Sequence, residues 1–297
     1  MQIRNHFPAV LSEATRASTA GQNSFMRWSA AGLMLACVAA LGGALSIEVS
    51  VGGRQFDAGG VLAVLAFAGG VVVAFYLLGA APQRMWYDGR ATAESIKTLS
   101  WQYTVGGGPF RIDPGAEPDD LFVRRLSEII GAMTSVPVGS LAGRAQITPE
   151  MRAVRDQPLP ARRALYLTQR IHDQISWYGA KAAHNQSRVR RWFLIAIVTQ
   201  AIGLVVGSLK AFSVVDVDLL GIVAAVAASS MAWLQTRDHQ NLAASYAVTG
   251  RELQIINTRA EAGAGIGSEQ RWADFVEDTE LAISREHTLW LARRGSA

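Results

Sequence analysis

The sequence has one cysteine, Cys37, which excludes an internal disulfide and a zinc site made of several thiolates. A phosphate-binding loop is also missing, because Gly106–Gly108 is not followed by Lys and then Ser or Thr. We find no nucleophile with a matching base, so the sequence predicts a protein that is not an enzyme and needs no cofactor. The histidines are scattered, and none has a second ligand at metal-binding spacing: His6, His172, His184, His239 and His287.

A strong net charge is missing as well. The 28 Lys and Arg residues against 24 Asp and Glu give a formal net charge of +4, which is too small to favour nucleic acid as a partner. Residues 1–27 are polar, and the apolar run after them is too long for a cleaved signal peptide. We therefore expect no secretory signal at this end of the sequence.

Long hydrophobic runs are what the sequence does have. Half of its residues are hydrophobic, and they gather in four runs without a charge: 28–47, 61–81, 192–209 and 219–234. A helix needs about 20 apolar residues to cross a bilayer. The fourth run is short, so a buried core helix is the alternative there, although a bilayer tolerates short spans by local thinning. The prediction is an all-α membrane protein with two transmembrane helical hairpins, whose first turn is a short Gly-rich loop.

The basic residues predict how the hairpins are oriented. The only Arg and Lys residues in the two loops inside the hairpins are Arg54 and Lys210. The other ends of the spans are flanked by many more: Arg16, Arg27, Arg84, Arg90, Lys97, Lys181, Arg188, Arg190, Arg191 and Arg237. The positive-inside rule then places both termini and the middle of the chain in the cytoplasm of a bacterium, with the spans in the inner membrane. Four tryptophans at the basic ends fit an interfacial aromatic belt: Trp28, Trp86, Trp192 and Trp233.

Helical periodicity extends beyond the spans. Tyr166–Leu209 is predicted to be one continuous helix, and the second and fourth spans are predicted to continue as helices to about Tyr103 and Ala260. One stripe at steps of three and four includes Tyr166, Arg170, Gln174, Trp177, Lys181, Asn185, Arg188 and Trp192. Another includes Trp86, Arg90, Glu94, Lys97 and Trp101. Each stripe is either an ordinary solvated face or a surface that packs or senses.

From these stripes we take eight residues as candidates for a cytoplasmic switch or ligand contact: Arg90, Glu94, Lys97, Trp101, Arg170, Gln174, Trp177 and Lys181. Inside the third span, Thr199 and Gln200 are candidates to line a pore, with hydrogen bonding between helices as the alternative. Small residues recur every fourth position in the spans and predict close helix packing within hairpins and between copies: Gly32, Ala36, Ala40, Ala44; Ala66, Gly70, Ala74; Thr199, Gly203, Gly207; Gly221, Ala225, Ser229.

The domain organisation follows from the spans and from the prolines. We expect a first unit at 1–135, a Pro-rich linker at 136–160 and a second unit at 161–292. Gly106–Pro109 is expected to stop the helix after the second span. Each unit repeats the order polar helix, span, short loop, span, polar helix. Arg27-Trp28 and Arg191-Trp192 hold the same place in the two repeats.

Two stretches resemble the SLATT family of bacterial domains, which have two transmembrane helices and a cytoplasmic helical extension. They are MWYDGRATAESIKTLSWQY with the following GGGPF, and YLTQRIHDQISWYGAKAAHNQSRVRRW. The chain resembles a third-type unit followed by a first-type unit. The resemblance implies an effector of a bacterial conflict system such as antiphage defence, which answers a nucleotide second messenger or a sensor protein. It also implies that a homo-oligomer opens a pore in the lipid bilayer. The alternative is a membrane scaffold that conducts nothing and presents a helical platform to a partner protein.

Overall fold

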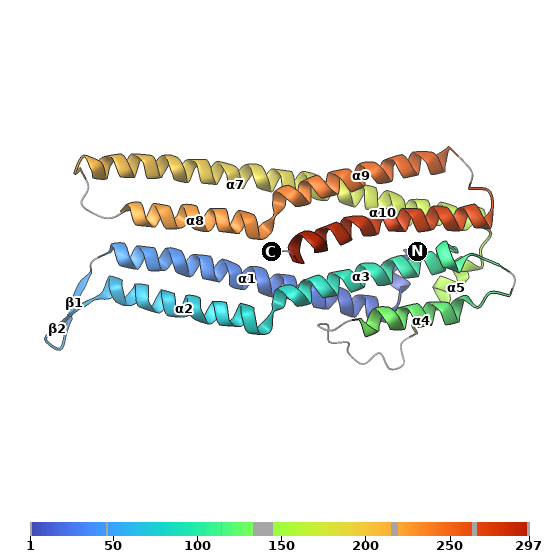
Figure 1. Cartoon of the computed structure of the whole chain (residues 1–297), viewed down its shortest axis with the longest axis horizontal. Helices are drawn as coiled ribbons and strands as arrows, with labels where there is room; N and C mark the ends of the chain where they lie inside the picture. Colours follow the sequence, from blue (N-terminus) through green and yellow to red (C-terminus); the bar gives the residue numbers. More distant parts are fainter. Residues whose placement is uncertain are drawn as a thin grey trace. The chain divides into compact units, whose positions relative to one another are not determined.

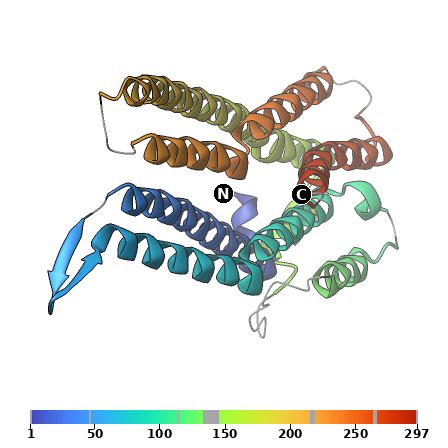
Figure 2. The ribbon, with the colours of Figure 1, turned by 60° about the vertical axis from the view of Figure 1, so that its left-hand side comes forward.

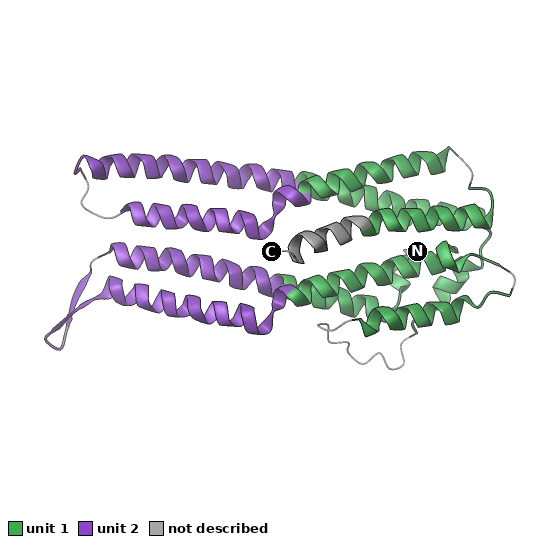
Figure 3. Cartoon of the chain, viewed as in Figure 1, with its two compact units in different colours: residues 1–22, 84–183, 243–297 green, residues 23–83, 184–242 purple. Residues whose placement is uncertain are grey.

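A computed structural model describes residues 2–45, 47–113, 115–132, 145–214, 219–262 and 266–295. The chain forms two compact units, coloured in Figure 3. Unit 1 consists of residues 1–22, 84–183 and 243–297, and unit 2 of residues 23–83 and 184–242. Both units are built almost wholly of helices.

The first hairpin of unit 2 pairs α1 (Ala9–Ala44) with α2 (Ala58–Ala80). We expected a loop between the two helices. The structure instead has two short antiparallel strands there, β1 (Glu48–Val51) and β2 (Arg54–Asp57) (Figure 1). Gly52 and Gly53 take φ of 60° and 80° between the strands, which is the geometry of a tight hairpin turn. The Asp57 side chain then caps α2 by accepting from the Gly59 N–H at 3.0 Å.

Close packing in this hairpin centres on Gly42 and Gly59. A Cβ on Gly42 would lie 2.7 Å from the Gly59 carbonyl oxygen, and a Cβ on Gly59 would overlap the carbonyl oxygen of Leu45, just after α1. Ala39, Ala66 and Val73 are buried along the same contact. The predicted stripe packs within this hairpin at Ala66 and Gly32, whereas Ala36 and Ala74 are exposed, and packing between copies stays a prediction. The residues at the contact are spaced three and four positions apart. Residues spaced four apart throughout, as we expected, turn gradually away from that face of the helix.

The second hairpin of unit 2 pairs the later part of α7 (Asp173–Ala211) with α8 (Leu219–Arg237) (Figures 1 and 2). A Cβ on Gly203 would touch Val223 at 3.3 Å, so the predicted small stripe of the third span does face α8. In all four candidate spans little of the apolar window is buried, 17% of it or less. These helices are long and apolar enough to cross a membrane, and the predicted fold class is confirmed.

The second and fourth spans do not continue unbroken, which corrects the prediction. Ala81 has φ of 39° and separates α2 from α3 (Pro82–Val105). A residue before proline is pushed out of the α-helical region, so Pro82 explains this break. Asp238 has φ of 52° and separates α8 from α9 (His239–Glu261). By contrast, α1 and α7 are unbroken and contain residues of both units.

Helix α6 (Leu159–Tyr166) joins α7 through a π-helical turn, η3 (Leu167–His172). The predicted continuous helix is confirmed, but its stripe is not one face. A π turn holds one extra residue and rotates the helix beyond it by about 100°. The buried positions therefore shift from Tyr166 and Arg170 to Tyr178 and Asn185, and Trp177 becomes exposed.

Unit 1 encloses a hydrophobic core built from the helices of both halves of the sequence. Besides α3, α6 and α9, unit 1 contains five further helical elements: η1 (Ile3–His6), η2 (Gly108–Phe110), α4 (Pro118–Gly131), α5 (Pro149–Arg155) and α10 (Glu269–Gly295). A chain of edge-on aromatic contacts crosses this core from Phe7 through Trp101 and Tyr166 to Trp272, with ring centroids 5.3–5.7 Å apart. Part of the expected linker, 136–144, lies outside the described residues, and α5 within it was not predicted.

The Gly-rich stop after α3 fits against α10. Gly106 has φ of 74° and ends the helix in the left-handed conformation. Gly107 lies so close to Val276 that a Cβ would overlap it. Two buried arginines take the free carbonyls at this helix end: Arg155 donates to Tyr103 O at 2.8 Å, and Arg162 to Val105 O at 2.6 Å. The helix stop predicted at Gly106–Pro109 is confirmed.

Candidate functional site

The candidate site in unit 1 is built around a buried carboxylate, Glu280 of α10. Arg170 donates two hydrogen bonds to it, at 2.9 and 2.6 Å. The Tyr166 hydroxyl donates at 2.9 Å and the Thr98 hydroxyl at 2.8 Å, so four donors from α3, α6 and η3 surround one carboxylate. The Arg170 and Glu280 side chains are 2% and 0% exposed, which makes this a fully desolvated ion pair.

The burial of this cluster perturbs its titration. Burial and the Glu280 charge raise the pKa of Tyr166 well above its usual value. Burial would lower the pKa of Arg170, but the adjacent Glu280 outweighs it and raises the pKa. Tyr166 and Arg170 therefore both keep their protons across the ordinary pH range. Two sequence candidates, Arg170 and Trp101, thus face the core of unit 1 and are not accessible to a ligand in this structure.

Five of the other candidates line one small cleft of about 180 Å³, which we call the α3–α7 cleft. They come from α3 and from the start of α7: Arg90, Glu94, Lys97, Gln174 and Trp177. The structure thus brings five candidates from the two stripes together, although the stripes lie 80 residues apart along the chain.

Charges within the α3–α7 cleft are already paired. Lys97 contacts Glu94 at 2.8 Å, and Arg4 of η1 contacts Asp173 at 3.0 Å. Burial would raise the pKa of Glu94, but Lys97, Arg170 and Arg90 outweigh it and hold the pKa below its usual value. A ligand here would have to compete with these ion pairs.

The eighth candidate, Lys181, lies beside the cleft. Its ammonium group is 5.7 Å from the centre of the Trp177 ring, within the range of a cation–π contact. Trp177 also packs edge-on against Tyr178 and Tyr246, with ring centroids 5.0 and 5.3 Å apart. This aromatic group fixes the first turns of α7 against α9.

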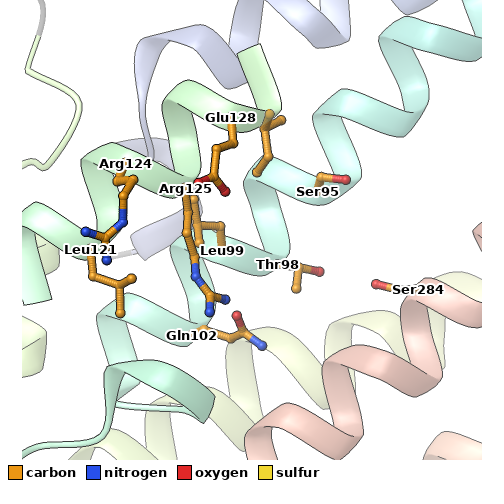
Figure 4. A pocket seen from close by; sticks show the side chains of 10 residues that line it. Ser95, Thr98, Leu99, Gln102, Leu121, Arg124, Arg125, Glu128 and Ser284 are labelled. Atoms are coloured by element: carbon orange, nitrogen blue, oxygen red, sulfur yellow. The ribbon is translucent and has the colours of Figure 1, made fainter. Parts of the chain in front are cut away.

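A larger opening, which we call the arginine groove, lies between α3, α4 and α10 (Figure 4). Its cavity is about 540 Å³, within the usual range for small-molecule sites. Arg124 and Arg125 line it, and neither has an ion-pair partner within the described residues. Figure 4 shows the Arg125 guanidinium extended toward the Gln102 amide. Other polar groups in the lining are Ser95, Thr98, Glu128 and Ser284.

Sequence reasoning missed the arginine groove. The only signal was the Arg124-Arg125 pair on the polar face of a predicted helix, and a solvated face gives the same pattern. Thr98 lines both the groove and the α3–α7 cleft and also donates to Glu280. Ser284 also lines both openings, so the groove and the cleft meet at these two residues beside the buried ion pair.

The two predicted pore residues lie in unit 2, within α7. Thr199 donates to the Ile195 carbonyl one turn back, at 2.8 Å, and is half-buried. The neighbouring Gln200 is exposed on the surface of this span. Among the described residues, no group of three or more His, Cys, Asp or Glu side chains could hold a metal.

Comparison with protein families gives two matches in tandem. A model described as "SMODS and SLOG-associating 2TM effector domain 3" matches residues 8–163, more than half of the chain. The chain belongs to the SLATT family. The first-type SLATT domain, described as "SMODS and SLOG-associating 2TM effector domain 1", matches residues 166–290. This SLATT chain is thus a multi-pass membrane protein made of two 2TM domains in the predicted order. Comparison with curated proteins and with solved structures gave no significant match.

Proposed function

We propose that this chain is a bacterial inner-membrane effector that assembles with other copies and opens a pore when unit 1 receives a cytoplasmic signal. The observation that carries the proposal is the tandem of 2TM effector domains whose four apolar helices are little buried within the chain. The placement of basic residues supports a cytoplasmic unit 1 and cytoplasmic termini.

Several copies are needed for a pore, because one chain offers little polar lining. The hydroxyls of Thr199 and Ser208 both donate to carbonyls of their own helix, at 2.8 Å. Gln200 is different, since its amide is exposed on a span that otherwise faces lipid. An amide in hydrocarbon is stabilised by a partner across a helix interface. Gln200 therefore favours contact with another copy or with water in a pore.

The arginine groove is the best entry for the signal. Two arginines without carboxylate partners suit phosphate groups, and the surrounding hydroxyls and amide suit a sugar or base, so a nucleotide second messenger fits the groove. A ligand at Thr98 would act on Glu280 and so on Arg170, which lies in the same continuous helix as the third span. A soluble sensor protein docking at the groove is the alternative source of the signal.

The test is leakage of a dye from liposomes that hold the purified protein, with and without cyclic dinucleotides inside the assay buffer. We expect ligand-dependent leakage that is lost in Arg124→Gln/Arg125→Gln. The matched control is Arg251→Gln, which removes an exposed arginine of α9 away from the groove. Gln200→Leu should keep ligand binding but reduce leakage. Tight vesicles under all these conditions, together with no growth arrest at high expression, would exclude the pore.

A scaffold is the second candidate, and one observation favours it. No charged residue lies in the apolar windows 28–47, 61–81, 192–209 and 219–234, so a single chain has no evident ion path. A stoichiometric soluble partner that binds unit 1, with reconstituted protein that conducts no current, would support this alternative.

A further inference from the structure

An apolar groove in unit 2 runs between α1, α8 and the start of the third span on α7. Its cavity is about 640 Å³, and its lining consists of Ala30, Leu33, Met34, Cys37, Val38, Trp192, Val226, Ser229, Ser230 and Trp233. Among its few polar groups, Ser229 is already used, because its hydroxyl lies 3.4 Å from both the Leu33 carbonyl oxygen and the Cys37 sulfur. An apolar ligand could therefore fill the groove without leaving many polar groups of the lining short of hydrogen-bond partners.

The length of the groove matches one leaflet of a bilayer. On α1 it extends from Ala30 to Val38, which is about 12 Å at 1.5 Å per residue. Half of a hydrocarbon core is about 15 Å. Ser229 contacts Leu33, and Ala225 one turn earlier contacts Cys37 one turn later, so α8 runs antiparallel to α1. Ala30 and Trp233 therefore lie at one end of the groove. The opposite end reaches toward the middle of the spans.

The end marked by Trp233 carries two arginines. Trp192 and Trp233 form a pair with ring centroids 6.4 Å apart, and the Arg237 guanidinium lies 4.7 Å above the Trp233 ring. Arg188 precedes Trp192 by one helical turn, and its charge acts on Arg237. Neither arginine has an ion-pair partner within the part of the chain that the structure describes.

Two neighbouring guanidinium groups without a carboxylate repel one another, and a shared anion relieves that repulsion. Arginine pairs bind phosphate oxygens with two parallel hydrogen bonds each. The nearest acid in sequence, Asp238, accepts a hydrogen bond from Asn241 at 2.7 Å. A phosphate at this point would sit at the tryptophan level, where the headgroups of a bilayer lie.

We propose that unit 2 binds one anionic glycerophospholipid, with an acyl chain in the groove and its headgroup phosphate between Arg188 and Arg237. Binding of this ligand uses both the apolar groove and the two arginine charges at its end. A neutral lipid would fill the groove without using the charges, and free phosphate would use the charges without filling the groove. The site is independent of whether the protein opens a pore.

The experiment is native mass spectrometry of the full chain, delipidated in detergent and then titrated with phosphatidylglycerol or phosphatidylcholine. One phosphatidylglycerol should bind per chain, about tenfold more tightly than phosphatidylcholine. Arg188→Gln/Arg237→Gln should remove that preference. Arg190→Gln removes the same charge two residues away, on the other side of α7, and should leave the preference unchanged.

A second variant tests the groove itself. Ser230→Phe fills the cavity but keeps both arginines, so it should abolish binding of the single lipid while the protein stays folded by circular dichroism. Equal binding of both lipids, equal loss in Arg190→Gln and Arg188→Gln/Arg237→Gln, or full competition by inorganic phosphate would each overturn the proposal. Unchanged lipid binding in Ser230→Phe would overturn it too.

Discussion

Replacing Arg170 alone should destabilise unit 1 strongly, because it leaves the Glu280 carboxylate buried without its ion partner. Arg170→Met removes the two hydrogen bonds of 2.9 and 2.6 Å and keeps only those from Tyr166 and Thr98. Breaking one side of a buried ion pair costs about 3–5 kcal/mol. At about 2–4 °C per kcal/mol for a unit of this size, the melting temperature should fall by roughly 6–20 °C.

Near-ultraviolet circular dichroism in detergent micelles reports this loss directly. The ring centroids of Trp101 and Trp272 lie 5.6 and 5.7 Å from that of Tyr166. The near-ultraviolet signal of these two tryptophans therefore reports on the packing around the ion pair. The double variant Arg170→Met/Glu280→Leu removes both charges and should be more stable than Arg170→Met alone. The reasoning would be refuted if the melting temperature of Arg170→Met fell by less than about 2 °C. It would also be refuted if the double variant lost as much stability as the two single variants added together.

Three further predictions concern packing and charge. Gly42→Ala should destabilise the first hairpin by about 1–3 kcal/mol, because its Cβ would meet the α2 backbone at 2.7 Å. The adjacent Gly43→Ala meets nothing within 4 Å and should be neutral in the same melting assay in micelles. Gly107→Ala should loosen the contact of α3 with α10, seen as faster amide exchange in unit 1 while unit 2 keeps its protection. Since the pKa of Glu94 is lowered on folding, its contribution to stability is present above about pH 4.5 and is lost as the pH falls below that value. Glu94→Gln should therefore flatten the acid limb of the stability curve, and an unchanged limb would contradict the assigned charge.

The spans, their pairing and the SLATT order could be predicted because lipid imposes a long uncharged run, which a sequence displays without any tertiary information. The break at Ala81 does have a sequence signal, which the prediction of an unbroken helix overlooked, because Pro82 disfavours a helical residue before it. The break at Asp238 has no comparable signal. It became visible only through the φ of 52° in the structure.

The site was harder to predict, because its decisive contacts are distant in the sequence. Glu280 lies 110 residues from Arg170, and nothing in the spacing of either residue indicates the other. The π turn at 167–172 likewise leaves no compositional mark, yet it moves Trp177 outward and Tyr178 inward. Local periodicity placed the candidates of the α3–α7 cleft on two helix faces, but it indicated neither that the two faces meet nor which side chains are buried.

Labelling of single cysteines in intact cells tests the membrane topology behind the whole account. In a Cys37→Ala background, Gln55→Cys reports the exposed hairpin between α1 and α2, and Ser127→Cys reports the exposed face of α4 in unit 1. A membrane-impermeant maleimide should label Gln55→Cys in cells whose outer membrane is permeabilised, and Ser127→Cys only after the inner membrane is opened. Equal labelling of both sites before that step, or recovery of the protein in the soluble fraction without detergent, would contradict the account.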